Sequence, residues 1–236
     1  MIIDAHCQLG ESRVQDFALS VTELGAALDE SGIDRACCFS FPDAVDNVAI
    51  IEAAADDRRL IPIACVDPNQ SNAANQLEDA LQRGARGLRL HPYLHGFKLS
   101  MTIVDPLFEL CARYGVPVLC HGADDVPANN PYQFAQMADR HPGVNLIALY
   151  GGFVWNVGDL LDAATRRDNL FLETCAWSPG NLRLAVREVG PEKIVFGSGL
   201  PDGDQMVCLA RAAVALPDEH ERALVLGGNM QRLLAL

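Results

Sequence analysis

The chain has 236 residues, of which 50% are hydrophobic and 21% are charged. This composition supplies apolar material for a large core and excludes disorder as the main state. There are 18 basic and 31 acidic side chains, so the formal net charge of −13 disfavours nucleic acid and anionic lipid surfaces as partners. The apolar stretch at residues 146–158 contains no charged side chain and is shorter than the ~20 apolar residues of a spanning helix. We therefore expect no membrane span. Because the first residues lack the pattern of a secretory signal, we also expect a cytoplasmic protein.

Short apolar runs rich in β-branched residues alternate along the chain with segments of helical periodicity. The apolar runs predict eight strands, at residues 1–6, 35–40, 60–66, 85–91, 116–121, 144–150, 169–174 and 193–198. The segments between them predict helices at 21–31, 47–57, 73–83, 103–114, 132–140, 157–167, 181–189 and 205–216. The tail, 218–236, predicts a closing helix with Asn229 as its N-cap.

Eight strand–helix units of about 30 residues each are typical of parallel strands that close into a (β/α)8 TIM barrel. We therefore predict an α/β fold with one domain over residues 1–236. The alternative is an open doubly wound sheet. That fold usually has fewer strands and often a glycine-rich turn after the first, whereas the first strand here ends in Asp4-Ala5-His6.

The eight cysteines form no C-x-x-C pair, and most lie in apolar segments. We therefore expect buried, unpaired thiols rather than a zinc knuckle or disulfides.

Polar residues at the ends of the predicted strands mark the candidate site, since reacting groups of such barrels lie where the loops leave the strands. Strict alternation places Asp4, His6 and Gln8 on one face of the first strand, toward the barrel axis, and residues 3, 5 and 7 toward the helices.

Three more polar side chains fall at later strand ends. Arg89 and His91 end the fourth strand and His121 ends the fifth, whereas His95, His141 and His220 are expected in loops or at the surface.

Seven motifs in this order resemble the amidohydrolase-related branch of the amidohydrolase superfamily, which contains metal-dependent hydrolases and decarboxylases. They are the segments at residues 3–10, 84–92, 116–122, 149–152, 169–174, 196–201 and 226–229. The resemblance covers nearly the whole chain. It implies the barrel fold, a small-molecule substrate and a homo-oligomer.

The resemblance also implies a metal site, but this sequence departs from the family pattern. His6 matches the first ligand and His121 the ligand on the fifth strand, whereas Gln8, Tyr150 and Gly199 stand where the family has two histidines and an aspartate. Catalytic zinc usually has three protein ligands. We therefore expect a divalent cation such as zinc to be bound weakly or not at all, unless nearby acidic residues replace the missing ligands. The candidates are Asp124, Asp125, Glu173, Asp202 and Asp204.

The remaining polar cluster suits a small polar or anionic organic substrate. Arg89 can hold a carboxylate through paired hydrogen bonds, and a histidine can transfer protons near neutral pH. We assign catalytic roles to His6, His121 and Asp4, and substrate binding to Gln8, Arg89, His91 and Tyr150. Trp155 and Trp177 follow two strands and are given no role.

Two classes of function stay open at this point. The first is an amidohydrolase-related enzyme that hydrolyses or decarboxylates its substrate with an altered or lost metal site. The second is a non-catalytic or metal-free relative that binds a metabolite or a partner subunit at the barrel mouth.

Overall fold

The strands follow the predicted order. The computed structural model describes residues 1–122, 130–152 and 157–236. Its strands are β1 (Ile3–Glu11), β2 (Ala18–Leu19), β3 (Arg35–Ser40), β4 (Leu60–Pro62), β5 (Ala64–Cys65), β6 (Leu88–Leu90), β7 (Val118–His121), β8 (Leu146–Leu149), β9 (Leu170–Glu173) and β10 (Ile194–Val195). The short β2 was not predicted and pairs antiparallel with β1. The third predicted strand is divided into β4 and β5.

The helices match the predicted segments, except that the short helix Pro92–His95 was not predicted. They are α1 (Val21–Ser31), α2 (Asn47–Asp56), α3 (Ala73–Gln82), α4 (Pro92–His95), α5 (Asp105–Tyr114), α6 (Pro131–Arg140), α7 (Val157–Thr165), α8 (Pro179–Val189), α9 (Gln205–Ala215), α10 (Glu219–Ala223) and α11 (Asn229–Leu234). Local signals fix their ends. Ser20 and Glu23 form a capping box at the start of α1, and Gly32 ends that helix in the left-handed conformation with φ 69°.

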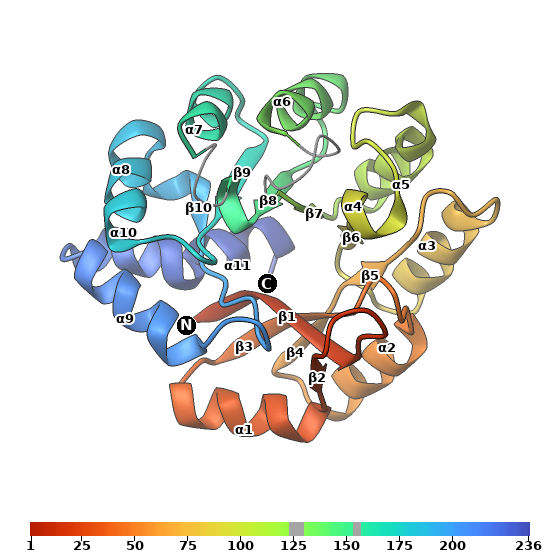
Figure 1. The fold of residues 1–236 in the computed structure, drawn as a ribbon, viewed down its shortest axis with the longest axis horizontal. Coiled ribbons are helices and arrows are strands. Elements are labelled where there is room, and N and C mark those ends of the chain that lie inside the picture. The colour runs from red at the N-terminus through yellow and green to blue at the C-terminus, as the bar shows by residue number, and fades with distance from the viewer. Residues whose placement is uncertain (123–129, 153–156) are drawn as a thin grey trace.

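The helices surround the strands as an outer ring, as expected for a (β/α)8 barrel (Figure 1). The ladders form two sheets with the orders β2-β1-β3-β4 and β10-β9-β8-β7-β6-β5. Backbone hydrogen bonds join the two sheets at both edges. Ile63 N–H donates to Cys38 O and Ala5 N–H donates to Phe196 O, each at 2.9 Å. The predicted TIM-barrel fold is therefore confirmed.

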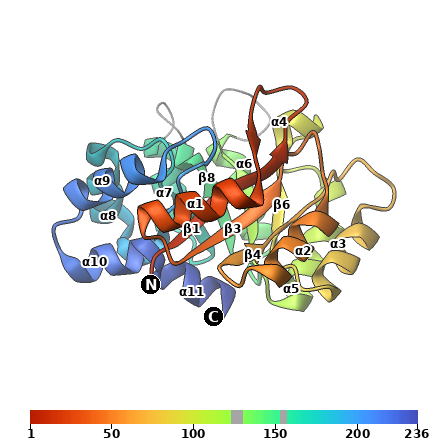
Figure 2. The same cartoon turned by 90° about the horizontal axis from the view of Figure 1, so that it is seen from below.

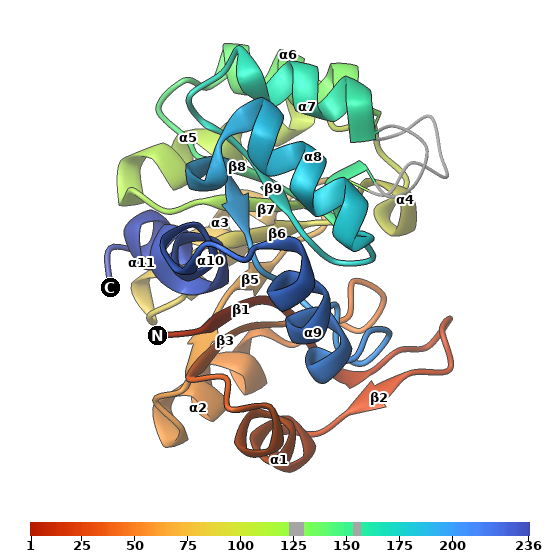
Figure 3. The same ribbon diagram turned by 90° about the vertical axis from the view of Figure 1, so that its left-hand side faces the viewer.

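The barrel interior is apolar below the strand ends. Inward side chains such as Ile3, Phe39, Leu119 and Phe171 form one buried cluster, which Met230, Leu233 and Leu234 of α11 cover from one end. Both chain termini lie at that end, whereas α4 lies at the opposite end (Figures 2 and 3). The candidate polar residues therefore lie at the opposite end from α11, where the strands finish.

The tail differs from the prediction at Asn229. This residue has helical dihedrals, φ −68° and ψ −45°, and continues a helical path from α10 through a π-turn at Leu224–Gly228 into α11. Its buried amide donates to the carbonyls of Pro191 and Ile194, each at 2.7 Å. Asn229 therefore anchors the tail to the strand region, and Asp218 caps α10 instead.

All eight cysteines are buried and unpaired, as predicted. Among the described residues, no helix combines the length and apolar character needed to cross a membrane.

Candidate active site

The carboxyl ends of the parallel strands gather five polar side chains at one end of the barrel: His6 of β1, Arg89 of β6, His121 of β7, Tyr150 directly after β8 and Glu173 of β9. The Tyr150 ring lies between two histidines. Its centroid is 5.0 Å from that of His6 and 5.1 Å from that of His121, both in edge-to-face contact. His91 stacks on His121 with centroids 4.0 Å apart. Four predicted residues, His6, Tyr150, His121 and His91, are thus joined by ring contacts.

A β-bulge in β1 changes which side chains face the axis. Asp4 pairs with Ala36 and Cys7 with Cys38, so β1 has one residue more than β3 between these two pairs. Ile3 and Ala5 consequently pack in the barrel interior, whereas Cys7 packs in the cluster on the helix side. The expectation that residues 3, 5 and 7 all face the helices is therefore wrong.

Asp4 lies on the helix side of the bulge, not beside the His6 imidazole. Its carboxylate accepts hydrogen bonds from Ser198 Oγ at 2.6 Å, from Ser198 N–H at 2.9 Å and from Gln205 Nε2 at 2.9 Å. It also accepts from His6 N–H at 3.0 Å and from Cys7 Sγ at 3.2 Å. Asp4 therefore ties β1 to the segment after β10 and to α9. The predicted placement of Asp4 on one face with His6 and Gln8 is wrong.

Gln8 lies beyond the bulge and is 6% exposed. Its N–H donates to Leu200 O at 2.9 Å, which extends the contact between β1 and the segment after β10.

Glu173, which the sequence offered as one of several replacement ligands, is the acidic neighbour of His6. Nδ1 of His6 lies 3.3 Å from Oε2 of Glu173, and both side chains are fully buried. Tyr150 N–H donates to the same oxygen at 2.8 Å, and Cys175 N–H donates to Oε1. Nε2 of His6 is buried and has no hydrogen-bond partner in the part of the chain that the structure describes. The sequence signal for Glu173 was its place at the end of the seventh predicted strand.

Arg89 is a buried cation without a carboxylate. Its side chain is 1% exposed, and no acidic group of the described residues lies within 4.0 Å of it. Nη1 donates to Leu90 O, the guanidinium carbon lies 5.1 Å from the centroid of the Phe39 ring, and Nε has no partner. Burial lowers the pKa of Arg89 below its usual value. Because buried charges in proteins are normally paired, this guanidinium has capacity for an anion.

The two stacked histidines are neutral. Burial, followed by the charges of His121 and Arg89, lowers the pKa of His91 below its usual 6.5. Burial and then Arg89 lower the pKa of His121 in the same direction. Burial raises the pKa of Tyr150, whose hydroxyl donates to Asp202 Oδ2 at 3.4 Å. The aromatic side chains around Arg89 are therefore uncharged at neutral pH.

Five positions of this chain correspond to the family's metal ligands: His6, Gln8, His121, Tyr150 and Gly199. The Tyr150 ring contacts both His6 and His121. Gly199 carries no donor, and a Cβ built there would lie 2.5 Å from Cys175 Sγ, so the cysteine fills this space. In the described part of the chain, the metal-type donors that do cluster are those of His6, Glu173 and Cys175, within 4.8 Å of one another.

An open pocket of about 400 Å³ adjoins this cluster. Tyr150, Cys175, Ser198 and Asp202 line it together with Cys208 and Arg211 of α9. Asp204, a candidate replacement ligand, also lines it and caps α9 by accepting from Val207 N–H at 2.8 Å.

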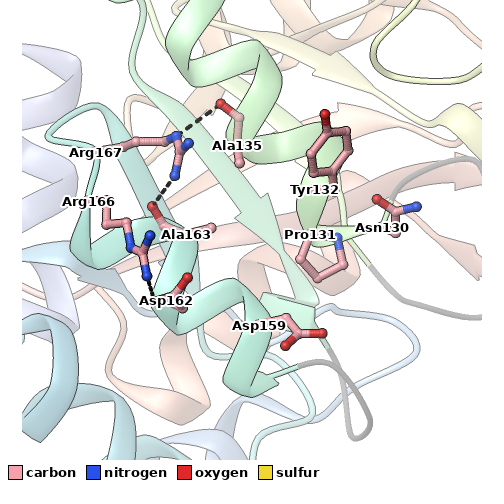
Figure 4. Close-up of a pocket in the computed structure, with 9 residues that line it drawn as sticks. All are labelled: Asn130, Pro131, Tyr132, Ala135, Asp159, Asp162, Ala163, Arg166 and Arg167. Carbon is pink, nitrogen blue, oxygen red and sulfur yellow. Dashed lines mark hydrogen bonds and ion pairs between the residues drawn. The ribbon is translucent and has the colours of Figure 1, made fainter.

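A second pocket, of about 430 Å³, lies outside the barrel between α6 and α7 (Figure 4). Its arginines already have partners: Arg166 pairs with Asp162 and Arg167 with Asp139, each at 2.7 Å. The barrel mouth, with its unpaired cation, is therefore the better candidate site.

Trp177 is buried, and its Nε1 donates to Gly151 O at 3.1 Å, which indicates packing. Asp124, Asp125 and Trp155 lie outside the described residues.

The sequence profile of the family described as Amidohydrolase matches residues 3–236. No curated protein matches the chain.

Several solved structures share the fold. An uncharacterized TIM-barrel protein from Bordetella bronchiseptica superposes with a TM-score of 0.85 at 19% identity, over 99% of this chain and 98% of that one. A 5-carboxyvanillate decarboxylase from Sphingomonas paucimobilis has a TM-score of 0.80 at 15% identity, over 100% and 99%. A probable 2-pyrone-4,6-dicarboxylic acid hydrolase from Acinetobacter baumannii, with citric acid bound, has a TM-score of 0.74 at 16% identity, also over 100% and 99%.

Proposed function

The chain belongs to the amidohydrolase family, and from that premise we propose that it is an enzyme acting on a small organic carboxylate held by Arg89. The observation that carries the proposal is the buried guanidinium, which has no carboxylate partner among the described residues. Names of the structural relatives point the same way, since they describe a carboxyvanillate decarboxylase and a dicarboxylic acid hydrolase.

A bound carboxylate would correct the charge balance around Arg89. Guanidinium–carboxylate hydrogen bonds are short, strong and often paired, and their value grows in a site that excludes water. The guanidinium is 1% exposed, so the ligand reaches it only when a side chain at the mouth, such as the half-buried Tyr150, moves aside.

The anion would also prepare His121 for proton transfer. Arg89 is one of the two main causes of the low pKa of His121, the other being burial. A carboxylate on Arg89 offsets that positive charge and raises the pKa of His121 toward the range in which an imidazole exchanges protons. His121 then donates or accepts the proton of the reaction, while the stacked His91 holds its ring in place.

The reaction is hydrolysis or decarboxylation, and Arg89 constrains both. Decarboxylation removes the negative charge of the departing carboxylate, so a guanidinium on that group would stabilise the substrate more than the transition state. We infer that Arg89 holds a carboxylate that remains in the product. A substrate for decarboxylation then carries at least two carboxylates.

The binding test uses calorimetric titration of chelator-treated protein with phthalate, citrate and the neutral amide benzamide. The parent and Arg89→Met are compared with Arg86→Met, because Arg86 donates to Leu234 O at the far end of the barrel. We expect Arg89→Met to weaken carboxylate binding by roughly 10–100-fold, the value of a charge-assisted hydrogen bond. Arg86→Met should bind like the parent. Equal affinities in parent and Arg89→Met, or equal affinity for benzamide, contradict the proposal.

Catalysis is tested by incubating the protein with 5-carboxyvanillate and 2-pyrone-4,6-dicarboxylate and analysing the products by mass spectrometry. For any compound that is converted, His121→Asn should abolish conversion while retaining carboxylate binding. Conversion that survives this substitution removes His121 from the chemistry.

A further inference from the structure

We propose that this chain binds a zinc-class transition-metal ion through His6, Glu173 and Cys175, a ligand set that differs from the family pattern. The proposal does not depend on the carboxylate site at Arg89. It rests on the convergence of an imidazole from β1 with a carboxylate and a thiol at the end of β9.

The spacing of the donor atoms suits a tetrahedral ion. All three ligand atoms lie within 4.8 Å of one another, and His6 Nδ1 is 3.3 Å from Glu173 Oε2. Zinc bonds of about 2.0–2.1 Å to nitrogen and oxygen place two tetrahedral ligand atoms about 3.3–3.4 Å apart. This distance is long for a hydrogen bond to a carboxylate and ordinary for the edge of a zinc site.

Backbone groups already orient the ligands. Tyr150 N–H and Cys175 N–H each donate to one oxygen of Glu173. A carboxylate has about four lone-pair positions, so these bonds leave room for an ion in place of the His6 contact. Such outer contacts to a ligand are typical of metal sites, where they hold ligands in position. The Cys175 thiol donates to Ser198 O at 3.2 Å, and metal binding replaces this hydrogen bond because the ligand is the deprotonated thiolate.

Charge and donor type select the ion. A thiolate and a carboxylate together neutralise a divalent cation, and the combination of sulfur with imidazole favours zinc over magnesium or calcium.

The neighbouring pocket gives the ion a route and an open position. Cys175 lines the pocket of about 400 Å³ together with Tyr150 and Asp202. Three protein ligands beside an accessible space are the arrangement of a zinc ion that also binds water or a small ligand.

The test measures metal content and metal affinity of the full chain. Protein is stripped with a chelator and titrated with Zn²⁺ and Co²⁺, and bound metal is counted by mass spectrometry. Three variants are compared with the parent: Cys175→Ser, Glu173→Gln and Cys208→Ser. Cys208 lines the same pocket but is not part of the donor cluster, so it is the matched control. Circular dichroism establishes that each variant is folded.

We expect one equivalent of metal per chain in the parent and in Cys208→Ser, with a sulfur-to-cobalt charge-transfer absorption. Cys175→Ser should lose that absorption and bind zinc more than about 100-fold more weakly, because loss of an outer contact alone costs about 10–100-fold. Glu173→Gln should retain the absorption at reduced affinity. Equal zinc affinity in the parent and Cys175→Ser, or cobalt binding without the sulfur band, overturns the proposal. Because carboxylate binding is measured on stripped protein, the two proposals fail separately.

Discussion

Replacing Arg89 with methionine is expected to stabilise the protein while removing its anion site. Burial of an ion costs several kcal/mol, and among the described residues two direct contacts of the guanidinium offset part of that cost. The bond from Nη1 to Leu90 O contributes about 1.5–3 kcal/mol, and the contact with the Phe39 ring at 5.1 Å contributes about 0.5–2 kcal/mol. Apolar replacement of buried charged groups gains about 1–4 kcal/mol, so we expect a gain near 2 kcal/mol. For a chain of this size that raises the melting temperature by roughly 4–8 °C.

Urea unfolding of ligand-free protein at neutral pH measures this difference. Arg167→Met is the control, because Arg167 is 20% exposed and pairs with Asp139 at 2.7 Å. Removal of that paired arginine should lower the free energy of unfolding by about 1 kcal/mol. If Arg89→Met destabilises the protein as much as Arg167→Met does, the guanidinium is already satisfied by the protein, and the reasoning is refuted.

Three further predictions concern the same end of the barrel. The folded-state pKa values of His91 and His121 lie below 6.5, so in acid the unfolded chain binds more protons than the folded protein. Urea unfolding should therefore show about 1.4 kcal/mol less stability per histidine at about pH 5.5 than at about pH 7.5. A free energy of unfolding that does not change with pH contradicts this. Gly199→Ala should lower the free energy of unfolding by about 1–3 kcal/mol, because φ is +76° and the new Cβ meets Cys175 Sγ. Adding Cys175→Ala should recover part of that loss, and strictly additive effects of the two substitutions would argue against the contact. Asp4→Ala should cost about 3–5 kcal/mol in thermal unfolding, because it leaves the donors of β1 and α9 without their buried acceptor, and a cost below about 1 kcal/mol would contradict its anchoring role.

The sequence predicts the order of strands and helices because each element carries a local signal. Apolar runs mark the strands, and glycines such as Gly32 and Gly115 end helices in the left-handed conformation. The strand ends likewise predict that Arg89, His121 and Tyr150 meet, since parallel strands present their carboxyl ends at one mouth.

Two features of the site could not be predicted from the sequence, because one depends on a single inserted residue and the other on a contact between separate segments. One extra residue in β1 inverts the side-chain alternation, so Asp4 turns to the helix side although its spacing from His6 suggests a shared face. The complementarity of Gly199 and Cys175 joins two strand ends far apart in the sequence. Neither effect leaves a periodic pattern that a single sequence displays.

The same applies to the pairing of His6 with Glu173. The acidic residue was visible as one of several replacement candidates, but its selection over Asp202 and Asp204 follows from the barrel geometry. Asp204 is engaged as a helix cap, whereas the Glu173 carboxylate is fully buried against the imidazole.

A crystal structure of the protein with phthalate tests the central claim most directly. The account predicts a ligand carboxylate inside the barrel mouth, within about 2.7–2.9 Å of the Arg89 guanidinium nitrogens. Density for the ligand only outside the barrel, with Arg89 paired to a carboxylate of the protein itself, would contradict it.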